Sequence, residues 1–503
     1  MNLLSITTRV CAGHRLASHA RANPFRRILA RRLPRFDRGK ALLPAVLVVL
    51  LFCGCTLTPD YTRPDAPVPG VWPTGAAYGE AKTDAATTAT EIPWQSFFND
   101  GRLQEVIALA LRQNRDLRLA SLNVERAQAL YRIQRAELFP SVNAVGSMSK
   151  SRTPADLSST GSAMTSERYD VNLGIASWEI DFFGRLRNLK DRALEEYLAT
   201  EQAQKSAQIL LIGAVANSYL ALAADQEALQ LATDTLATHE ESYRLTQRRR
   251  EVGMISELDL GRLRSQVEAA RGERARSEQL VALDKNALQL LIGTNLPAHL
   301  LPADLATVAP VRQVAPGLSS EVLLNRPDVL AAEHRLKGAA ANIGAARKAF
   351  LPRISLTSAL GTASADLSGL FASGSGAWSF APVVALPIFD ARTWSAYAVT
   401  KVDREILLAQ YEKAIQTAFR EVADALAVQG TVGRQIQAQQ ALIEAIEGTY
   451  RFSKLRYDRG IDSYLSVLDA QRSLYAAQQG LNALRFLEAA NRVTLYKVLG
   501  GGR

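Results

Sequence analysis

The chain has 503 residues, of which 21% are charged, and a mean hydropathy of −0.04, which does not fit a polytopic helical membrane protein. Its formal net charge is +10, but residues 1–40 contain nine Arg and one Lys against the single acid Asp37, so nine of these charges lie there. The remainder is nearly neutral, which excludes nucleic-acid binding through a broadly basic surface.

Residues 1–54 have the features of a secretion signal. The basic segment is followed by the apolar run ALLPAVLVVLLF, whose twelve residues are too few to span a bilayer as a helix. Gly54 and Cys55 come next, and a cysteine at this junction resembles a bacterial lipobox, in which the thiol is acylated and the leader is removed. We therefore predict a lipoprotein signal peptide at 1–54 and a covalent lipid, such as palmitate, on Cys55. No other cofactor is expected, and the alternative is ordinary secretion with a free cysteine.

The rest of the chain is predicted to contain two copies of one structural unit. Similar segments recur about 210 residues apart, so that Asp116 corresponds to Asp328 and Gly253 to Gly460. The predicted parts are an extended, lipid-anchored linker at 55–100, repeats at 101–295 and 321–503, and an equatorial linker at 296–320.

Each repeat is predicted to run in the order helix, two strands, long helix, Gly turn and returning helix. Residues 185–250 contain no Pro, and apolar residues recur every seven positions from Val215 to Tyr243, a spacing typical of coiled-coil packing. At about 1.5 Å per residue, such a helix would be roughly 100 Å long. The uncharged stretch 206–224 could instead be a transmembrane helix. The sevenfold pattern continues through it into charged sequence, however, which favours burial against other helices.

Four short segments of alternating polarity are predicted to be strands: SVNAVGSMSKS, YDVNLGIASWEID, RISLTSALGTAS and WSFAPVVALPIFD. Aromatic residues such as Trp178 and Trp378 lie near their ends, as in membrane β-barrels, and a small soluble sheet is the alternative. The Gly- and Ser-rich segments 150–168 and 361–376 are expected to be loops. Four strands cannot close a barrel, and lipid does not tolerate an open sheet edge, so a membrane location requires strands from several chains.

Several segments resemble the outer-membrane factor family of TolC-like channels, in particular the NodT-type lipoproteins of resistance-nodulation-division efflux pumps. They are CTLTPDYTRPDAPVPGVW, WQSFFNDGRLQEVIALALRQNRDLRLA, SWEIDFFGRLRN and LLNRPDVLAAEHRLKGAAANIGAARKAFLPRI. The resemblance covers nearly all of residues 55–500. It implies a membrane α+β fold, in which a homotrimer forms one twelve-stranded outer-membrane β-barrel, with four strands per chain. This barrel would continue into a long periplasmic α-helical barrel with a mixed equatorial region.

The resemblance also implies a function and a set of partners. The function is a passive exit duct for drugs or other small toxic compounds in a tripartite efflux pump, and hence a role in antibiotic resistance. The chain would be lipid-anchored in the outer membrane of a Gram-negative bacterium and extend into the periplasm. Its partners would be a periplasmic adaptor (a membrane fusion protein), an inner-membrane resistance-nodulation-division transporter and outer-membrane lipid, with no nucleic acid.

Two alternatives to the efflux duct stay open. One is an outer-membrane duct for type I protein secretion, which would share the architecture. The other is a lipid-anchored periplasmic coiled-coil scaffold without a pore. The sequence contains no hydrolase, phosphate-loop or metal-binding motif, so no enzyme activity, catalytic residue or metal is expected.

The candidate functional residues lie at the two Gly turns that follow the long helices. By the same resemblance, these turns form the periplasmic tip, where the adaptor would contact Gly253, Met254, Gly460 and Ile461. The gate residues carried over from the family are Asp259, Tyr457, Ser466 and Asp469. A ring of three like carboxylates narrows and charges a pore, and a Tyr–Asp hydrogen bond between neighbouring hairpins would hold it shut. The alternative is that these are solvated turn residues.

Overall fold

A computed structural model of the chain describes residues 57–78, 89, 92–253, 255–302, 304–305, 308 and 319–502. The predicted signal peptide at 1–54, the predicted lipidation residue Cys55 and the turn residue Met254 lie outside these residues. The described residues all belong to one compact unit, Leu57–Arg503.

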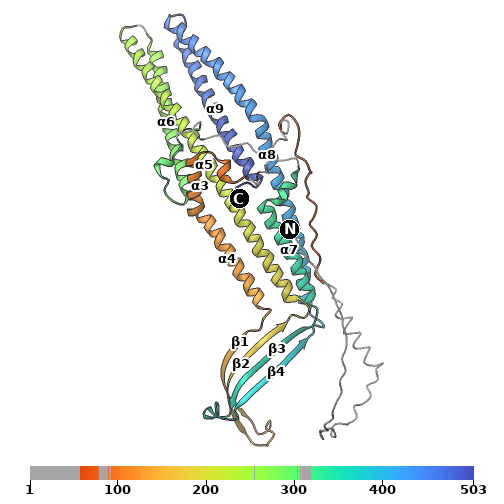
Figure 1. The fold of residues 1–503 in the computed structure, drawn as a ribbon. Coiled ribbons are helices and arrows are strands. Elements are labelled where there is room, and N and C mark those ends of the chain that lie inside the picture. The colour runs from red at the N-terminus through yellow and green to blue at the C-terminus, as the bar shows by residue number, and fades with distance from the viewer. Residues whose placement is uncertain are drawn as a thin grey trace, which may run out of the picture. The chain divides into compact units, whose positions relative to one another are not determined.

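Both repeats show the predicted order of helix, two strands, long helix and returning helix (Figure 1). The segment predicted as an extended linker, 55–100, contains the short helix α2 (Trp94–Phe97). The first repeat contains α3 (Gly101–Gln113), α4 (Arg115–Ala136), β1 (Val142–Thr153), β2 (Met164–Ile180), α5 (Arg185–Glu251) and α6 (Glu257–Ile292), followed by η2 (Ala298–Leu300). The second contains η3 (Ser320–Asn325), α7 (Pro327–Lys348), β3 (Arg353–Ser364), η4 (Leu367–Gly369), β4 (Gly376–Ala385), α8 (Ala391–Asp458) and α9 (Tyr464–Val498).

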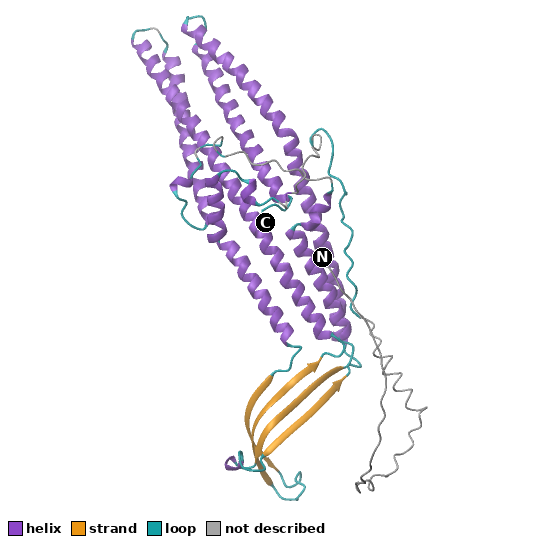
Figure 2. Cartoon of the chain, viewed as in Figure 1, coloured by secondary structure: helices purple, strands orange, loops and turns teal. Residues whose placement is uncertain are grey.

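Within this unit, the strands lie at one end of the long helices and the two hairpin turns lie at the other end (Figure 2). The predicted strands are therefore all present, and α5 and α8 reach 67 and 68 residues. The loops are shorter than predicted, because β1 continues to Thr153 and β2 begins at Met164. β3 ends at Ser364, as predicted for RISLTSALGTAS, so the loop after it begins later than the expected residue 361. The strands therefore extend into sequence that is rich in Gly and Ser.

An aspartate at equivalent positions of the two repeats starts each long helix directly after a strand pair. The Asp181 carboxylate accepts hydrogen bonds from the backbone N–H groups of Leu186 (2.9 Å) and Arg187 (3.0 Å). The Asp390 carboxylate accepts one from the N–H of Arg392 (3.0 Å). Such a carboxylate pairs with otherwise unsatisfied N–H groups and favours the positive end of the helix dipole. Both repeats thus keep an aspartate that begins the long helix shortly after the second strand.

The Asn-Arg-Pro-Asp segment at 325–328 fixes the start of α7. Pro327 occupies the first helical position, where its missing N–H leaves no unmade bond. Arg326 donates to the carboxylates of Asp328 (2.7 Å) and Glu421 (2.9 Å) and to the carbonyl oxygen of Val498 (2.7 Å). One largely buried guanidinium therefore joins the beginning of α7 to α8 and to the end of α9.

The main hydrophobic core lies midway along the helices and includes the apolar part of α5. Val215, Tyr219 and Leu222 are fully buried there. Helix α5 is long and apolar enough to cross a membrane by length and composition, but these side chains pack in the protein core, as the sevenfold pattern predicted. The ring of Tyr496 stacks on Phe97 at 3.8 Å between centroids.

Candidate functional site

The four strands form one antiparallel sheet in the order β1-β2-β3-β4, and its two faces differ in polarity. Leu173, Leu360 and Trp378 are paired in one row across β2, β3 and β4, and their side chains are 60, 70 and 77% exposed. Because successive residues of a strand point to opposite faces, Asn143 and Asn172 belong to the other face. One apolar and one polar face is the arrangement of a wall between lipid and water.

Among the described strands, both outer strands of this sheet are unpaired along one edge. β1 pairs with β2 alone, and β4 pairs with β3 alone. An unpaired edge exposes a row of backbone N–H and C=O groups, which cannot be left without partners in lipid. The sheet can therefore stand in a membrane only if other strands complete it.

The turn between α5 and α6 is held by local polar contacts. Gly253 has φ +79°, a conformation that residues with a Cβ rarely adopt. Arg250 forms an ion pair with Glu257 across the turn. Ser256 begins α6: its hydroxyl oxygen accepts from the N–H of Asp259 (3.2 Å), and the hydroxyl donates to the Asp259 carboxylate (2.7 Å). The chain therefore reverses in a defined geometry.

The turn between α8 and α9 follows the same plan with different residues. Gly460 has φ +74°, and its N–H donates to the carbonyl of Tyr457 at 2.9 Å. The N–H of Ile461 donates to the carbonyl of Arg456, also at 2.9 Å. The Arg456 guanidinium binds the Asp462 carboxylate across the turn, with 3.0 Å between Nη2 and Oδ1. Hydrogen bonding to Arg456 lowers the pKa of Asp462 below its ordinary value.

An aromatic cluster joins the two hairpins near these turns. Its buried members are Leu263 of α6 with Tyr464, Val467 and Leu468 of α9, and Tyr243, Tyr450 and Tyr457 pack against them. The ring of Tyr457 lies 4.8 Å from that of Tyr464, and Arg249 of α5 lies 5.8 Å from the Tyr457 centroid. The sevenfold pattern of the first long helix includes Tyr243, whereas nothing in the sequence pointed to Tyr464, the first residue of α9.

The predicted gate residues do not all meet within one chain. The Asp259 carboxylate binds Ser256 and Arg262 of its own hairpin. The Tyr457 hydroxyl is buried without a hydrogen-bond partner among the described residues. Ser466 and Asp469 lie exposed on α9. A bond between Tyr457 and Asp259 is therefore not formed inside this chain. The predicted Tyr–Asp hydrogen bond would need the hairpin of another copy and stays a prediction.

The turns expose apolar side chains beyond the aromatic cluster. Val252, Leu258 and Ile461 are 68, 63 and 58% exposed. Gly253 and Gly460 are also exposed, with open space where a Cβ would be placed. Each of the two turns therefore presents at least one exposed apolar side chain.

Residues 57–78 form an extended segment, here called the strap, that runs along α7 and α8. It begins at the sheet end, where Leu57 accepts from Arg347 (3.1 Å) and Thr58 from Lys348 (3.2 Å). It ends near the core, where Trp72 stacks on Phe419 at 5.3 Å. The first described residues of the chain are therefore located at the junction of helices and sheet.

Comparison with known proteins shows extensive similarity. The sequence matches the family described as outer membrane efflux protein over residues 106–294 and 318–501. It is 47% identical over 464 residues to the toluene efflux pump outer membrane protein TtgC of Pseudomonas putida, covering 92% of this chain and 96% of that protein.

Solved structures show the same fold. A membrane protein from Pseudomonas aeruginosa is 39% identical, with a TM-score of 0.82 and coverage of 89% of this chain and 100% of that chain. The open state of the Neisseria gonorrhoeae MtrE outer membrane channel is 36% identical, with a TM-score of 0.80 and coverage of 89% and 98%.

Proposed function

The chain belongs to the outer membrane efflux protein family, and we propose that three copies of it form a gated exit duct across the outer membrane and the periplasm. The predicted fold class is confirmed by the related channel structures. The chain is an outer-membrane component of an efflux pump, and its family consists of channel proteins rather than enzymes. The single observation that best supports the proposal of a duct is the sheet, which has one apolar face, one polar face and two unpaired edges.

The proposal of a trimer rests on the edges of the sheet and on the helices beside them. Four strands per chain give twelve in three copies, which is above the smallest known barrels of about eight strands. Exposed apolar residues continue from the open edges onto the neighbouring helices. They are Leu119, Leu122 and Ile133 on α4, and Val399 on α8. In a closed ring α8 of one copy would meet α4 of the next.

We propose that the partners dock at the hairpin turns. The exposed apolar residues Val252, Leu258 and Ile461 support a contact with a periplasmic adaptor there. An inner-membrane resistance-nodulation-division transporter would supply energy and select the cargo. The related protein TtgC is named for toluene efflux, and we propose small apolar or drug-like compounds as cargo here.

We propose that Cys55 carries the lipid anchor. The support comes from the strap: the Leu57 carbonyl accepts from Arg347 at the end of α7, and the Thr58 hydroxyl accepts from Asn188 at the start of α5, where both helices adjoin the sheet. This is where the membrane boundary lies if the sheet spans the bilayer. A lipid on Cys55 would therefore enter the membrane without any rearrangement of the strap. Replacing Cys55 by Ser is expected to remove the lipid mass from the mature protein and to leave the fold unchanged.

Planar bilayer recordings of the purified mature protein test the duct. We expect discrete, small and mostly closed conductances, and heat-sensitive trimers on gels. Tyr457→Phe combined with Asp259→Ala should raise the single-channel conductance if these residues hold the gate. Unchanged conductance in this double variant would remove the pair from the gate. Absence of conductance in all variants with altered turns would instead point to a scaffold without a pore.

A further inference from the structure

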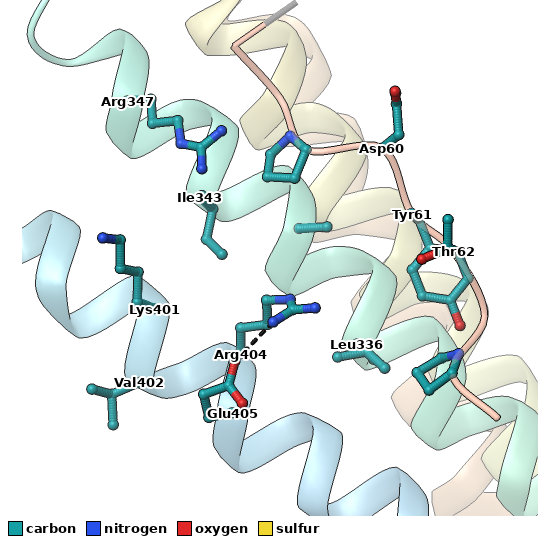
Figure 3. A pocket seen from close by; sticks show the side chains of 13 residues that line it. Asp60, Tyr61, Thr62, Leu336, Ile343, Arg347, Lys401, Val402, Arg404 and Glu405 are labelled. Carbon is teal, nitrogen blue, oxygen red and sulfur yellow. Dashed lines mark hydrogen bonds and ion pairs between the residues drawn. The ribbon is translucent and has the colours of Figure 1, made fainter. Parts of the chain in front are cut away.

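A groove of about 500 Å³ lies between the strap, α7 and α8, close to the sheet end (Figure 3). Leu336 and Ile343 of α7 and Val402 of α8 give it apolar walls. Arg347 and Lys401 lie on either side of it. Arg347 is the penultimate residue of α7, and β3 begins shortly after it, at Arg353. The groove is therefore located just outside the predicted membrane boundary.

Among the described residues, Arg347 and Lys401 are cations without an acidic partner. Nε of Arg347 donates to the Tyr397 hydroxyl at 3.3 Å, and Nζ of Lys401 lies 4.5 Å from the centroid of the Tyr397 ring. Neither cation forms an ion pair with a carboxylate in the part of the chain that the structure describes. The third cation, Arg404, is paired with Glu405 at 2.7 Å.

The remaining acid of the groove, Asp60, lies on the strap. Its carboxylate points away from the groove (Figure 3). The lining of the groove therefore carries three cations, Arg347, Lys401 and Arg404, against the two carboxylates of Asp60 and Glu405. A ligand of complementary chemistry would carry a negative charge.

An aromatic series leads from these cations to the sheet. Tyr397 contacts Phe350 edge-to-face, with 6.1 Å between centroids, and Phe350 contacts Trp394 at 4.7 Å. Trp394 is exposed, and Phe389, between β4 and α8, is 89% exposed. Aromatic rings with adjacent cations are typical of the interface between membrane and water, where anionic lipid head groups lie.

We propose that this groove binds one anionic phospholipid of the outer membrane's periplasmic leaflet, with its phosphate between Arg347 and Lys401 and its acyl chains over the aromatic series. The inference rests on the proposed function, because it requires the sheet to span a membrane. If Cys55 carries the proposed lipid, that lipid inserts outside the channel, so the strap and the groove beside it lie on the outer side of the duct, next to the lipid head groups, and not on the lumen. The bound phospholipid would hold the ends of α7 and α8 at the membrane surface.

Native mass spectrometry of the purified full-length mature protein tests this proposal, with phosphatidylglycerol and phosphatidylethanolamine as probes. We expect one saturable phosphatidylglycerol per chain and much weaker binding of phosphatidylethanolamine. Arg347→Gln with Lys401→Gln should weaken phosphatidylglycerol binding about tenfold or more. Lys401→Gln alone should weaken it severalfold and does not disturb the bond between Arg347 and the strap. The matched control is Arg404→Gln, which removes a cation of the same groove that is already paired.

Several results would overturn the inference. Equal affinity of the wild type and the double variant for phosphatidylglycerol would exclude the two cations as its site, and equal binding of both lipids would exclude charge recognition. Lipid binding that arises only after Cys55→Ser would show that the chain's own lipid fills the groove. A double variant that loses its trimer, with no lipid bound to the wild type, would assign the groove to a neighbouring copy. Normal conductance without lipid binding would refute this inference alone, whereas absent conductance would refute the duct.

Discussion

The strap allows a quantitative prediction because one buried carboxylate, that of Glu333, binds two of its residues. Glu333 of α7 is 2% exposed and accepts hydrogen bonds from Nη2 of Arg63 (2.7 Å) and from the Tyr61 hydroxyl (3.2 Å). Lys337 forms an ion pair with it at 3.1 Å. Burial by itself raises the pKa of Glu333, but hydrogen bonds from Arg63 and Lys337 outweigh this effect and hold the pKa below its ordinary value. The carboxylate is therefore ionised at neutral pH and binds the strap as an anion.

Glu333→Gln keeps the shape of the side chain and removes its charge. A hydrogen bond to a charged group contributes about 1.5–3 kcal/mol, and we take the lower end because the Arg63 side chain is 46% exposed. A loss of about 1.5–2 kcal/mol raises the open fraction of the strap roughly 10- to 30-fold. Chymotrypsin cleavage after Tyr61 reports this fraction, because proteolysis follows the open population when closing is fast.

The control is Arg335→Gln on the same helix, whose exposed contact with Glu196 is long, at 3.9 Å. This variant should be cleaved after Tyr61 at the wild-type rate. Wild-type cleavage of Glu333→Gln would refute the assignment of the strap's stability to this carboxylate. An equal acceleration in both variants would show that α7 has been destabilised as a whole.

Three further predictions concern stability, each measured by thermal or chemical unfolding in detergent. Burial, followed by the neighbouring Asp225 carboxylate, raises the pKa of Asp284 to about 6, so the folded chain retains a proton that the unfolded chain releases near pH 4. The free energy of unfolding should fall as the pH rises from about 4 through 6, by about 1 kcal/mol after allowance for solvent screening of this partly exposed group. Asp284→Asn should flatten that pH dependence. An unchanged slope of unfolding free energy against pH would contradict the assignment of this dependence to Asp284. Tyr496→Phe removes a buried hydroxyl that donates to the Ile92 carbonyl at 2.6 Å, and should destabilise the fold by about 1–2 kcal/mol; an unchanged melting temperature would show that this bond contributes nothing net. Gly293→Ala should destabilise by about 2 kcal/mol or more, because φ is +77° and a Cβ would lie 2.5 Å from a backbone oxygen of the α3–α4 junction. Gly433→Ala is its control: it lies in open space in α8 and should stabilise slightly.

The elements of the fold could be predicted because each has a local signal. The Pro-free, sevenfold pattern through Val215 identified α5, and alternating polarity identified all four strands. Gly253 and Gly460 marked the turns, since both have the positive φ that glycine adopts without strain. The duplication strengthened these predictions, because the same order of signals occurs twice in one chain.

Contacts between distant segments had no such signal. Nothing near Glu333 in the sequence indicates that its partners are Tyr61 and Arg63, some 270 positions earlier. The lone tyrosine Tyr464 gave no pattern of its own, although it lies at the centre of the cluster that joins the hairpins. The gate at the turns stays a prediction, because the pairing of Tyr457 with Asp259 would need a neighbouring copy, which no single chain contains.

The strap also bears on the order in which the molecule is made. Its residues leave the ribosome and cross the inner membrane first, yet their partners on α7 and α8 follow some 270 to 358 positions later. Contacts of such separation form late, because most of the chain must be ordered before they can close. The segment exported first is therefore expected to be fixed among the last, and its resistance to chymotrypsin during refolding would mark the completion of the second repeat.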